Sequence, residues 1–328
     1  MVSPPEQGIT LNGDDLQVIV LADRGAEITS IVDRRTGIDL LFRPPWTGDV
    51  DIPADEPRNT RTDWHAHYRG GWNLLLPNAG DERDVDGVLW PFHGEASRVA
   101  WSVDASRDAV DTVALATSLI LVPLDLRRTL AIDGPRLTVT TEATNVGREP
   151  VEVYWQEHPA YGAPLIGPAT RIETGARTFL ADQAAPGDHL TPGSAHPWPT
   201  VRTRSGDALD LRGLPVAGQS RATLGTLTDF DRPYATIVNP DVDLGVSCEW
   251  DPGVHPHAWF WQELAASDAF PWYRRAYVMA IEPSTTIPGS GTVDGHDRGV
   301  GLILAPGETR TSTVTLTTFP STVDRPCV

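Results

Sequence analysis

The chain has 328 residues, 26 of them basic and 44 acidic, which gives a net charge of −18 at pH 7. Nucleic acids and anionic membranes attract basic surfaces, so this composition argues against both as partners. The two cysteines, Cys248 and Cys327, are too few for a disulfide scaffold. The first ten residues lack the basic and apolar regions of a signal peptide, and no apolar run approaches the ~20 residues that span a bilayer. We therefore expect a cytoplasmic protein.

Short segments rich in valine, isoleucine and threonine recur along the chain and predict β-strands. They cover residues 16–22, 26–33, 38–42, 111–121, 136–146 and 311–319. Asp133 and Gly134 mark a hairpin turn, and residues 175–225 read as loops with short strands. No stretch of helical length is convincingly amphipathic, and no linker divides the chain. The prediction is an all-β fold, a single large antiparallel β-sandwich domain over residues 1–328.

The chain uses tryptophan 11 times, and most tryptophans lie beside histidines, acids and amides. They gather in residues 64–93, 154–161 and 255–273. Core tryptophans would scatter over the strands, whereas aromatic rings beside polar groups suit sugars. The C–H faces of a sugar ring lie on the aromatic rings, and its hydroxyls bond to the polar groups. The clustering therefore favours a sugar or polyol site.

Two histidine pairs raise the question of a metal. His65 and His67, and likewise His255 and His257, are separated by one residue. On a strand each pair would project from one face, which is a geometry that can ligate a metal. No spacing rule joins pairs so far apart in sequence, so the favoured interpretation is that these histidines line a substrate site or are satisfied locally. We expect no metal.

The segment "AYVMAIEP" (276–283) reads as a buried strand closed by Glu282. A buried carboxylate is costly unless it is paired or functional, and burial would raise its pKa toward the range of a general base. The alternative is a structural pair with Arg274 or Arg275. For Glu263 it is likewise open whether the carboxylate is functional or structural. No nucleophile or phosphate-binding motif stands out, so hydride and phosphoryl transfer are poorly supported.

Five short motifs together resemble the aldose 1-epimerase, or galactose mutarotase-like, superfamily. They occur in the order of that family and span residues ~20–285. They are "RGAEITSIVDRRTGIDLLF" (24–42), "GGWNLLLPNAGD" (70–81), "FHGEASRVAW" (92–101), "WQEHPAYG" (155–162) and "YVMAIEP" (277–283). The resemblance implies a β-supersandwich with a sugar groove across one sheet, consistent with the strand pattern.

The resemblance also implies a reaction, the exchange of the α and β anomers of a reducing sugar without metal or organic cofactor. One group takes the proton of the anomeric hydroxyl while another protonates the ring oxygen. Carried over by motif, His158 would be the general acid and Glu282 the general base. His93 would bond a ring oxygen or a hydroxyl, and Asn78 and Trp155 would line the groove.

Two features depart from the pattern of well-studied hexose mutarotases. Pro159 follows His158, fixes φ and removes a donor, so it is expected to change the aim of the imidazole. Galactose mutarotases also use an arginine near the first loop, and in this sequence Arg69 and Arg98 are both candidates for that role. Arg69, Trp261 and Glu263 complete the expected substrate-binding set.

Two other functions stay open at this point. The first is a non-catalytic carbohydrate-binding protein, in which Trp155, Trp259 and Trp261 are stacking platforms. The second is another isomerase or a lyase on the same scaffold, metal-assisted if the two histidine pairs converge. In each case the expected partner is a small sugar or sugar derivative, and a homodimer is the candidate assembly. A mutarotase requires His158 and Glu282 to face one cavity, with room for a sugar ring between them.

Overall fold

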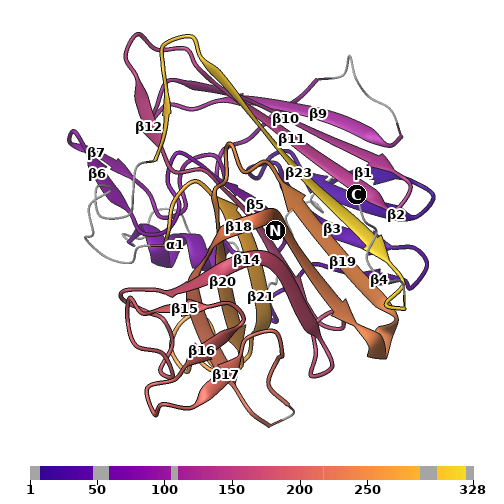
Figure 1. Cartoon of the computed structure of the whole chain (residues 1–328). Coiled ribbons are helices and arrows are strands. Elements are labelled where there is room, and N and C mark those ends of the chain that lie inside the picture. The colour runs from indigo at the N-terminus through magenta and orange to yellow at the C-terminus, as the bar shows by residue number, and fades with distance from the viewer. Residues whose placement is uncertain (1–7, 47–58, 105–109, 217, 289–300, 323–328) are drawn as a thin grey trace.

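The computed structural model describes residues 8–46, 59–104, 110–216, 218–288 and 301–322. The Cys327 position lies outside these residues. Their fold is an antiparallel β-sandwich (Figure 1), which confirms the predicted fold class. Among the described residues, no helix combines the length and the apolar character that a membrane span requires.

The first layer of the sandwich pairs seven strands side by side. In order across the layer they are β1 (Ile9–Asn12), β2 (Leu16–Leu21), β3 (Glu27–Asp33), β5 (Trp72–Leu75), β13 (Gln156–Gly162), β21 (Tyr277–Ser284) and β20 (His257–Leu264). The predicted strand 38–42 is reduced to β4 (Ile38–Asp39), a short partner of β3.

The second layer packs behind the first and consists of six strands. They are β8 (Ser102–Val103), β9 (Thr112–Ser118), β10 (Leu124–Asp133), β11 (Arg136–Asn145), β23 (Thr309–Phe319) and β19 (Leu244–Trp250). β10 and β11 form the predicted hairpin, with Asp133 opposite Arg136 and Gly134 in a left-handed conformation. Both strands alternate buried and exposed residues, as expected when one face meets the core.

Two long strands, β14 (Arg171–Ala181) and β18 (Arg221–Asn239), connect the layers at one corner. The first part of β18 pairs with β20 in the first layer, and its last part pairs with β19 in the second. A register shift between Thr174 and Ala176 marks a bulge, and such bulges bend a strand. The two layers are therefore continuous through this corner.

Short elements fill the connections. They are the hairpins β6 (Arg83–Val85) with β7 (Val88–Trp90) and β16 (Thr200–Arg202) with β17 (Ala208–Asp210), the pair β12 (Val151–Val153) with β22 (Leu302–Leu304), the strand β15 (Ala195–Pro197) and the 3-10 helix η2 (Pro240–Val242). Residues 182–220 hold the predicted short strands and loops, whereas both ends of the predicted region 175–225 belong to the long strands β14 and β18.

The sequence predicts no helix, and here the structure differs: α1 (Thr60–His67) lies against the first layer (Figure 1). Asn59 caps it by accepting a hydrogen bond from the backbone N–H of Thr62 at 2.7 Å. Of its eight residues only Trp64 is buried, so the sequence of α1 shows no repeating apolar pattern from which a helix could be predicted.

Candidate functional site

Strand β13 is buried on both faces and carries polar groups on each. Side chains alternate along a strand, so Gln156, His158 and Ala160 face outward and Glu157 faces the core. The register places His158 opposite the interval of β21 that contains Glu282, because Ala160 pairs with Ala280. The outward face of β13 therefore brings the two predicted catalytic groups together.

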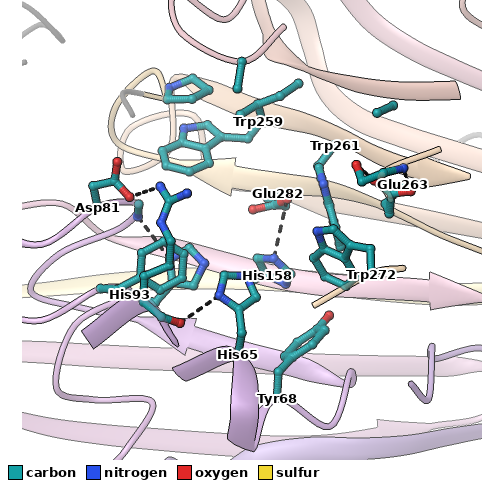
Figure 2. A pocket seen from close by; sticks show the side chains of 18 of the residues that line it. His65, Tyr68, Asp81, His93, His158, Trp259, Trp261, Glu263, Trp272 and Glu282 are labelled. Atoms are coloured by element: carbon teal, nitrogen blue, oxygen red, sulfur yellow. Dashed lines mark hydrogen bonds and ion pairs between the residues drawn. The ribbon is translucent and has the colours of Figure 1, made fainter. Parts of the chain in front are cut away.

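A cavity of about 270 Å³ lies over this outward face, and both His158 and Glu282 line it. Ligand pockets span roughly 300–1,000 Å³, so this one suits a single small molecule. Six aromatic residues surround it, drawn from α1, the loop before residue 93, β20 and the loop after β20. They are Trp64, Tyr68, Phe92, Trp259, Trp261 and Trp272. Figure 2 shows most of these rings grouped around the His158–Glu282 pair.

The two groups of the pair are in close contact. Nε2 of His158 lies 3.7 Å from Oε1 of Glu282, and the Gln156 amide donates a hydrogen bond to Oε2 of Glu282. They face one cavity, as a mutarotase requires, but the distance is too short for a sugar ring between them. A sugar would instead present the edge that bears its two anomeric oxygens to both groups at once. β21 continues past Glu282 to Ser284, so this carboxylate lies within the strand.

Burial shifts both groups of the pair toward their neutral forms. Desolvation lowers the pKa of His158 to about 4, and the nearby His65 adds to this effect. Desolvation also raises the pKa of Glu282 well above its usual range, and the hydrogen bond from Gln156 opposes this shift. Both shifts favour the neutral imidazole and the protonated carboxyl, so a pair that holds one proton carries it on Glu282.

Two further histidines present opposite hydrogen-bonding groups. The backbone N–H of Gly80 donates to Nδ1 of His93 at 3.1 Å, so Nε2 of His93 carries the proton. Nδ1 of His65 lies 2.8 Å from the carbonyl oxygen of Arg61, so Nδ1 is the donor and Nε2 a free acceptor. Burial lowers the pKa of both, to about 4 for His65. His93 is thus a neutral donor, consistent with a bond to a sugar oxygen.

The cavity wall also carries a charged pair, Arg61 with Asp81, and the sequence motifs did not indicate this pairing. The guanidinium of Arg61 pairs with the carboxylate of Asp81 and lies 5.2 Å from the centre of the Phe92 ring. Both charged residues line the cavity. Because Asp81 neutralises Arg61, this wall offers no uncompensated positive charge to a phosphate group.

The sequence does not predict the helix α1, and two glycines of the motif 70–81 set its position beside the site. Gly70 and Gly71 have positive φ values of 82° and 71°, and a Cβ on Gly70 would lie 1.8 Å from the carbonyl oxygen of Phe42. The close approach lets the chain turn from α1 directly into β5. Trp64 and Tyr68 are thereby held over the cavity with their rings stacked at 4.7 Å.

Two of the predicted binding residues, Trp155 and Asn78, lie outside the cavity. Trp155 comes immediately before β13 and faces the core, edge-on to His255 at 5.7 Å. Asn78 is fully buried and donates to the carbonyl oxygens of Asp81 and Pro91, so it holds the loop that carries His93.

Arg69 and Arg98 line a separate cavity on the other side of Trp64 and Tyr68. Arg98 pairs there with Asp63. Neither arginine lines the cavity that contains His158 and Glu282, so the arginine expected near the first loop is absent from that cavity's described lining.

Trp261, Trp259 and Glu263 do line the cavity, on alternate positions of β20. The carboxylate of Glu263 is already engaged, because it accepts from the backbone N–H groups of Ala266 and Ser267 and from the Ser267 hydroxyl. Its observed contacts stabilise the loop after β20 rather than a ligand.

The two histidine pairs do not converge. His65 and His67 are on α1, where residues two apart point in different directions. His255 is in the core, 2.7 Å from the Ser312 hydroxyl, and His257 contacts Thr228. Across the described part of the chain, no cluster of three or more histidines, cysteines or acids could hold a metal ion.

The arginine partners considered for Glu282 are engaged elsewhere. Arg274 lies 3.9 Å from Asp268, and Arg275 donates to the carbonyl oxygen of Pro45. Glu282 instead contacts Gln156 and His158, both on β13.

Pro159 does not turn the strand away. β13 continues through it to Gly162. Its register with β21 pairs Gln156 with Ser284 and then resumes at Ala160, so Pro159 falls in a gap of this ladder where no N–H is used. The imidazole of His158 keeps its aim toward Glu282.

Comparison with solved structures identifies the architecture. A galactose mutarotase-like protein from Lactobacillus casei ATCC 334 matches with a TM-score of 0.62 at 18% identity, over 95% of this chain and 100% of that one. A galactose mutarotase-like protein from Clostridium acetobutylicum matches with a TM-score of 0.66 at 16% identity, over 95% of each chain. The GalM/aldose epimerase homologue from C. elegans matches with a TM-score of 0.65 at 15% identity, over 96% and 99%.

At these identities the likeness establishes the fold, and it confirms the resemblance seen in the motifs. No curated protein matches the sequence at a significant level. The family model with the description "Domain of unknown function (DUF4432)" matches residues 8–318. The chain therefore belongs to the DUF4432 family and has a galactose mutarotase-like fold.

Proposed function

We propose that this protein is a sugar mutarotase, which exchanges the anomers of an aldose by opening and closing its ring. The observation that carries the proposal is the His158–Glu282 pair, with 3.7 Å between Nε2 and Oε1, facing a cavity walled by aromatic rings. The fold shared with galactose mutarotase-like proteins supports the same function. The neutralised Arg61 favours an aldose without a phosphate group.

The reaction needs a donor and an acceptor at two oxygens of one carbon. Ring opening removes the proton of the anomeric hydroxyl, breaks the bond between the anomeric carbon and the ring oxygen, and protonates that ring oxygen. The aldehyde then rotates about the adjacent carbon–carbon bond, and the hydroxyl attacks its other face. Two groups side by side at van der Waals distance can serve both oxygens in one step, because those oxygens share a carbon.

One shared proton is enough for this cycle. The directions of the two pKa shifts favour this proton on Glu282, which would give it to the ring oxygen while His158 accepts the anomeric proton. The resemblance implies the reverse assignment, with His158 as the acid and Glu282 as the base. Both assignments use the same number of protons, so the unit that catalyses the reaction is the pair. Ring closure returns the pair to its starting state.

A non-catalytic sugar-binding protein is the second candidate. The observation that favours it is the aromatic lining together with the neutral His93 donor and His65 acceptor, which suffice to hold a sugar. In this case the pair would only contribute hydrogen bonds.

Magnetisation-exchange NMR over a panel of aldoses, ketoses and sugar phosphates separates the two candidates. We expect faster exchange between the anomers of at least one unphosphorylated aldose. Replacement Glu282→Gln should abolish this acceleration while sugar binding survives, because the amide cannot transfer the proton. Measurable binding without acceleration of any sugar would support the binding protein and contradict the mutarotase.

A further inference from the structure

Tyr68, at the C-terminal end of α1, carries a buried hydroxyl that the reaction described above does not use. Its side chain lines the cavity, and the residue is 4% exposed. Among the described residues its Oη has no hydrogen-bond partner. Burying a hydroxyl without a partner is unfavourable, and native proteins seldom retain one without a purpose. The hydroxyl thus has room for a partner from a ligand.

The position of Tyr68 is fixed by its neighbours. Its ring stacks on Trp64 at 4.7 Å and meets Trp272 edge-on at 6.4 Å. In Figure 2 the hydroxyl points away from α1, toward the side of the site where His158 and Trp272 lie. A tyrosine held in this way loses little conformational freedom when it binds a ligand.

The hydroxyl lies close to the reacting pair. The ring centres of Tyr68 and His158 are 6.3 Å apart, and Tyr68 lines the same cavity as His158 and Glu282. Burial raises the pKa of Tyr68 well above 10, so its hydroxyl stays protonated and acts as a donor rather than as a base.

We propose that Tyr68 determines specificity by donating a hydrogen bond to the hydroxyl on the carbon next to the anomeric carbon of the sugar. The proposal rests on the mutarotase function. With both anomeric oxygens at the His158–Glu282 pair, that hydroxyl is the nearest remaining polar group on the same side of an aldose. The preferred substrates are accordingly aldoses that carry this hydroxyl, in preference to their 2-deoxy analogues.

The first test needs no sugar and compares two tyrosines. Tyr161 is as deeply buried as Tyr68, but its hydroxyl is hydrogen-bonded to Cys248. Replacement Tyr68→Phe should leave the Tm of the empty protein unchanged or raise it, because it removes an unpartnered hydroxyl. The matched Tyr161→Phe variant should lower the Tm. A fall in Tm for Tyr68→Phe as large as that for Tyr161→Phe would overturn the proposal, because it would show a structural hydrogen bond.

The second test is a cycle of two proteins and two sugars. D-glucose and D-galactose are compared with their 2-deoxy analogues, by calorimetric Kd and by anomer exchange. The wild type should bind the parent sugar about 3- to 10-fold more tightly, the size of one neutral hydrogen bond. The Tyr68→Phe variant should bind parent and analogue equally.

The outcomes distinguish the role of Tyr68 from the mutarotase function on which it rests. A variant that keeps the preference of the wild type contradicts the role of Tyr68, even where exchange is catalysed. Loss of the preference without any exchange by the wild type supports Tyr68 as a binding residue and contradicts the mutarotase. Binding of no aldose on the panel by the wild type contradicts both.

Discussion

At the scale of single residues, the site depends on how burial distributes one proton between His158 and Glu282. An exposed imidazole and carboxylate at this distance would form an ion pair, with the imidazole charged. At this buried position the neutral forms are favoured, because desolvation lowers the pKa of His158 and raises that of Glu282. Proton transfer to and from a sugar is then not opposed by a strong ion pair.

This distribution predicts the pH dependence of catalysis. The pair works with one proton and stops when it gains a second. Since the pKa of His158 is lowered to about 4, kcat/KM should stay level as the pH falls from 7 to 5 and should decrease only near pH 4. Circular dichroism at each pH distinguishes loss of catalysis from unfolding. An acid limb near 6.5, the ordinary pKa of histidine, would contradict a buried neutral imidazole.

At the scale of secondary structure, β13 divides its side chains between catalysis and stability. His158 faces the cavity, and its neighbour Glu157 faces the core. There Glu157 forms two hydrogen bonds of 2.9 Å with the guanidinium of Arg128 on β10 and accepts a third from the Trp72 indole. Arg128 and Glu157 are both fully buried. This ion pair connects the two layers directly behind the site.

Breaking this ion pair should destabilise the protein strongly. Replacement Arg128→Met leaves the Glu157 carboxylate buried without its partner, which costs roughly 3–5 kcal/mol. Urea unfolding measures the loss. The exposed pair Arg177–Asp231 is the control, and Asp231→Asn should cost less than about 1 kcal/mol. A loss in Arg128→Met no larger than in the control would show that Glu157 is satisfied without Arg128.

Most strands of the sandwich could be predicted from the sequence, but which face of β13 meets the cavity could not. Strands such as β10 and β11 alternate visibly, and their hairpin is marked by Asp133 and Gly134. In β13 both faces are buried, so no alternation of exposed polar residues shows in the sequence that His158 faces the cavity and Glu157 the core. Only the register with β21 decides it.

The helix α1 is a second feature that could not be predicted from the sequence. Its sequence, "TRTDWHAH", has no apolar periodicity, because its contribution to the site is a single buried ring, Trp64. Two histidines separated by one residue were therefore placed on a strand face. Tyr68 carried no sequence signal at all, since its role depends on contacts with Trp64 and Trp272 that only the fold creates.

At the scale of the whole molecule, the protein buries an unusual set of histidines. His93, His158 and His255 lie in the interior, and burial lowers the pKa of each. The unfolded chain would take up protons on all three below its ordinary pKa of about 6.5, while the folded chain would not. Glu282 acts in the opposite direction, because its raised pKa makes the folded state hold one extra proton above about 4.5.

The lowered histidine pKa values predict acid sensitivity. Between pH 6.5 and pH 5 the unfolded state takes up protons that the buried histidines do not, so the free energy of unfolding should fall as the pH decreases, with each such histidine contributing up to about 1.4 kcal/mol per pH unit. Replacement His255→Gln removes one histidine remote from the cavity and should make this dependence shallower by that amount. Chemical denaturation at several pH values measures it. A free energy of unfolding independent of pH in this window would contradict the neutral buried histidines.

The arrangement of two layers around a continuous corner places the cavity on the outer face of the first layer, away from the core. Polar side chains on the outer face of a strand can then bind a ligand, while those on the inner face stabilise the sandwich. The long strands β14 and β18 join the layers at the corner, and the first part of β18 also contributes Ala222, Thr223 and Leu224 to the cavity wall.

The central claim is that His158 and Glu282 catalyse anomer exchange as one unit. Magnetisation-exchange NMR on the wild type, His158→Gln, Glu282→Gln and the double variant measures it most directly, with the aldose that the panel identifies. Each single replacement should abolish the acceleration, and the double replacement should cost no more than either, because neither group acts without the other. A single variant that keeps most of the wild-type rate, or losses that multiply in the double variant, would contradict the account.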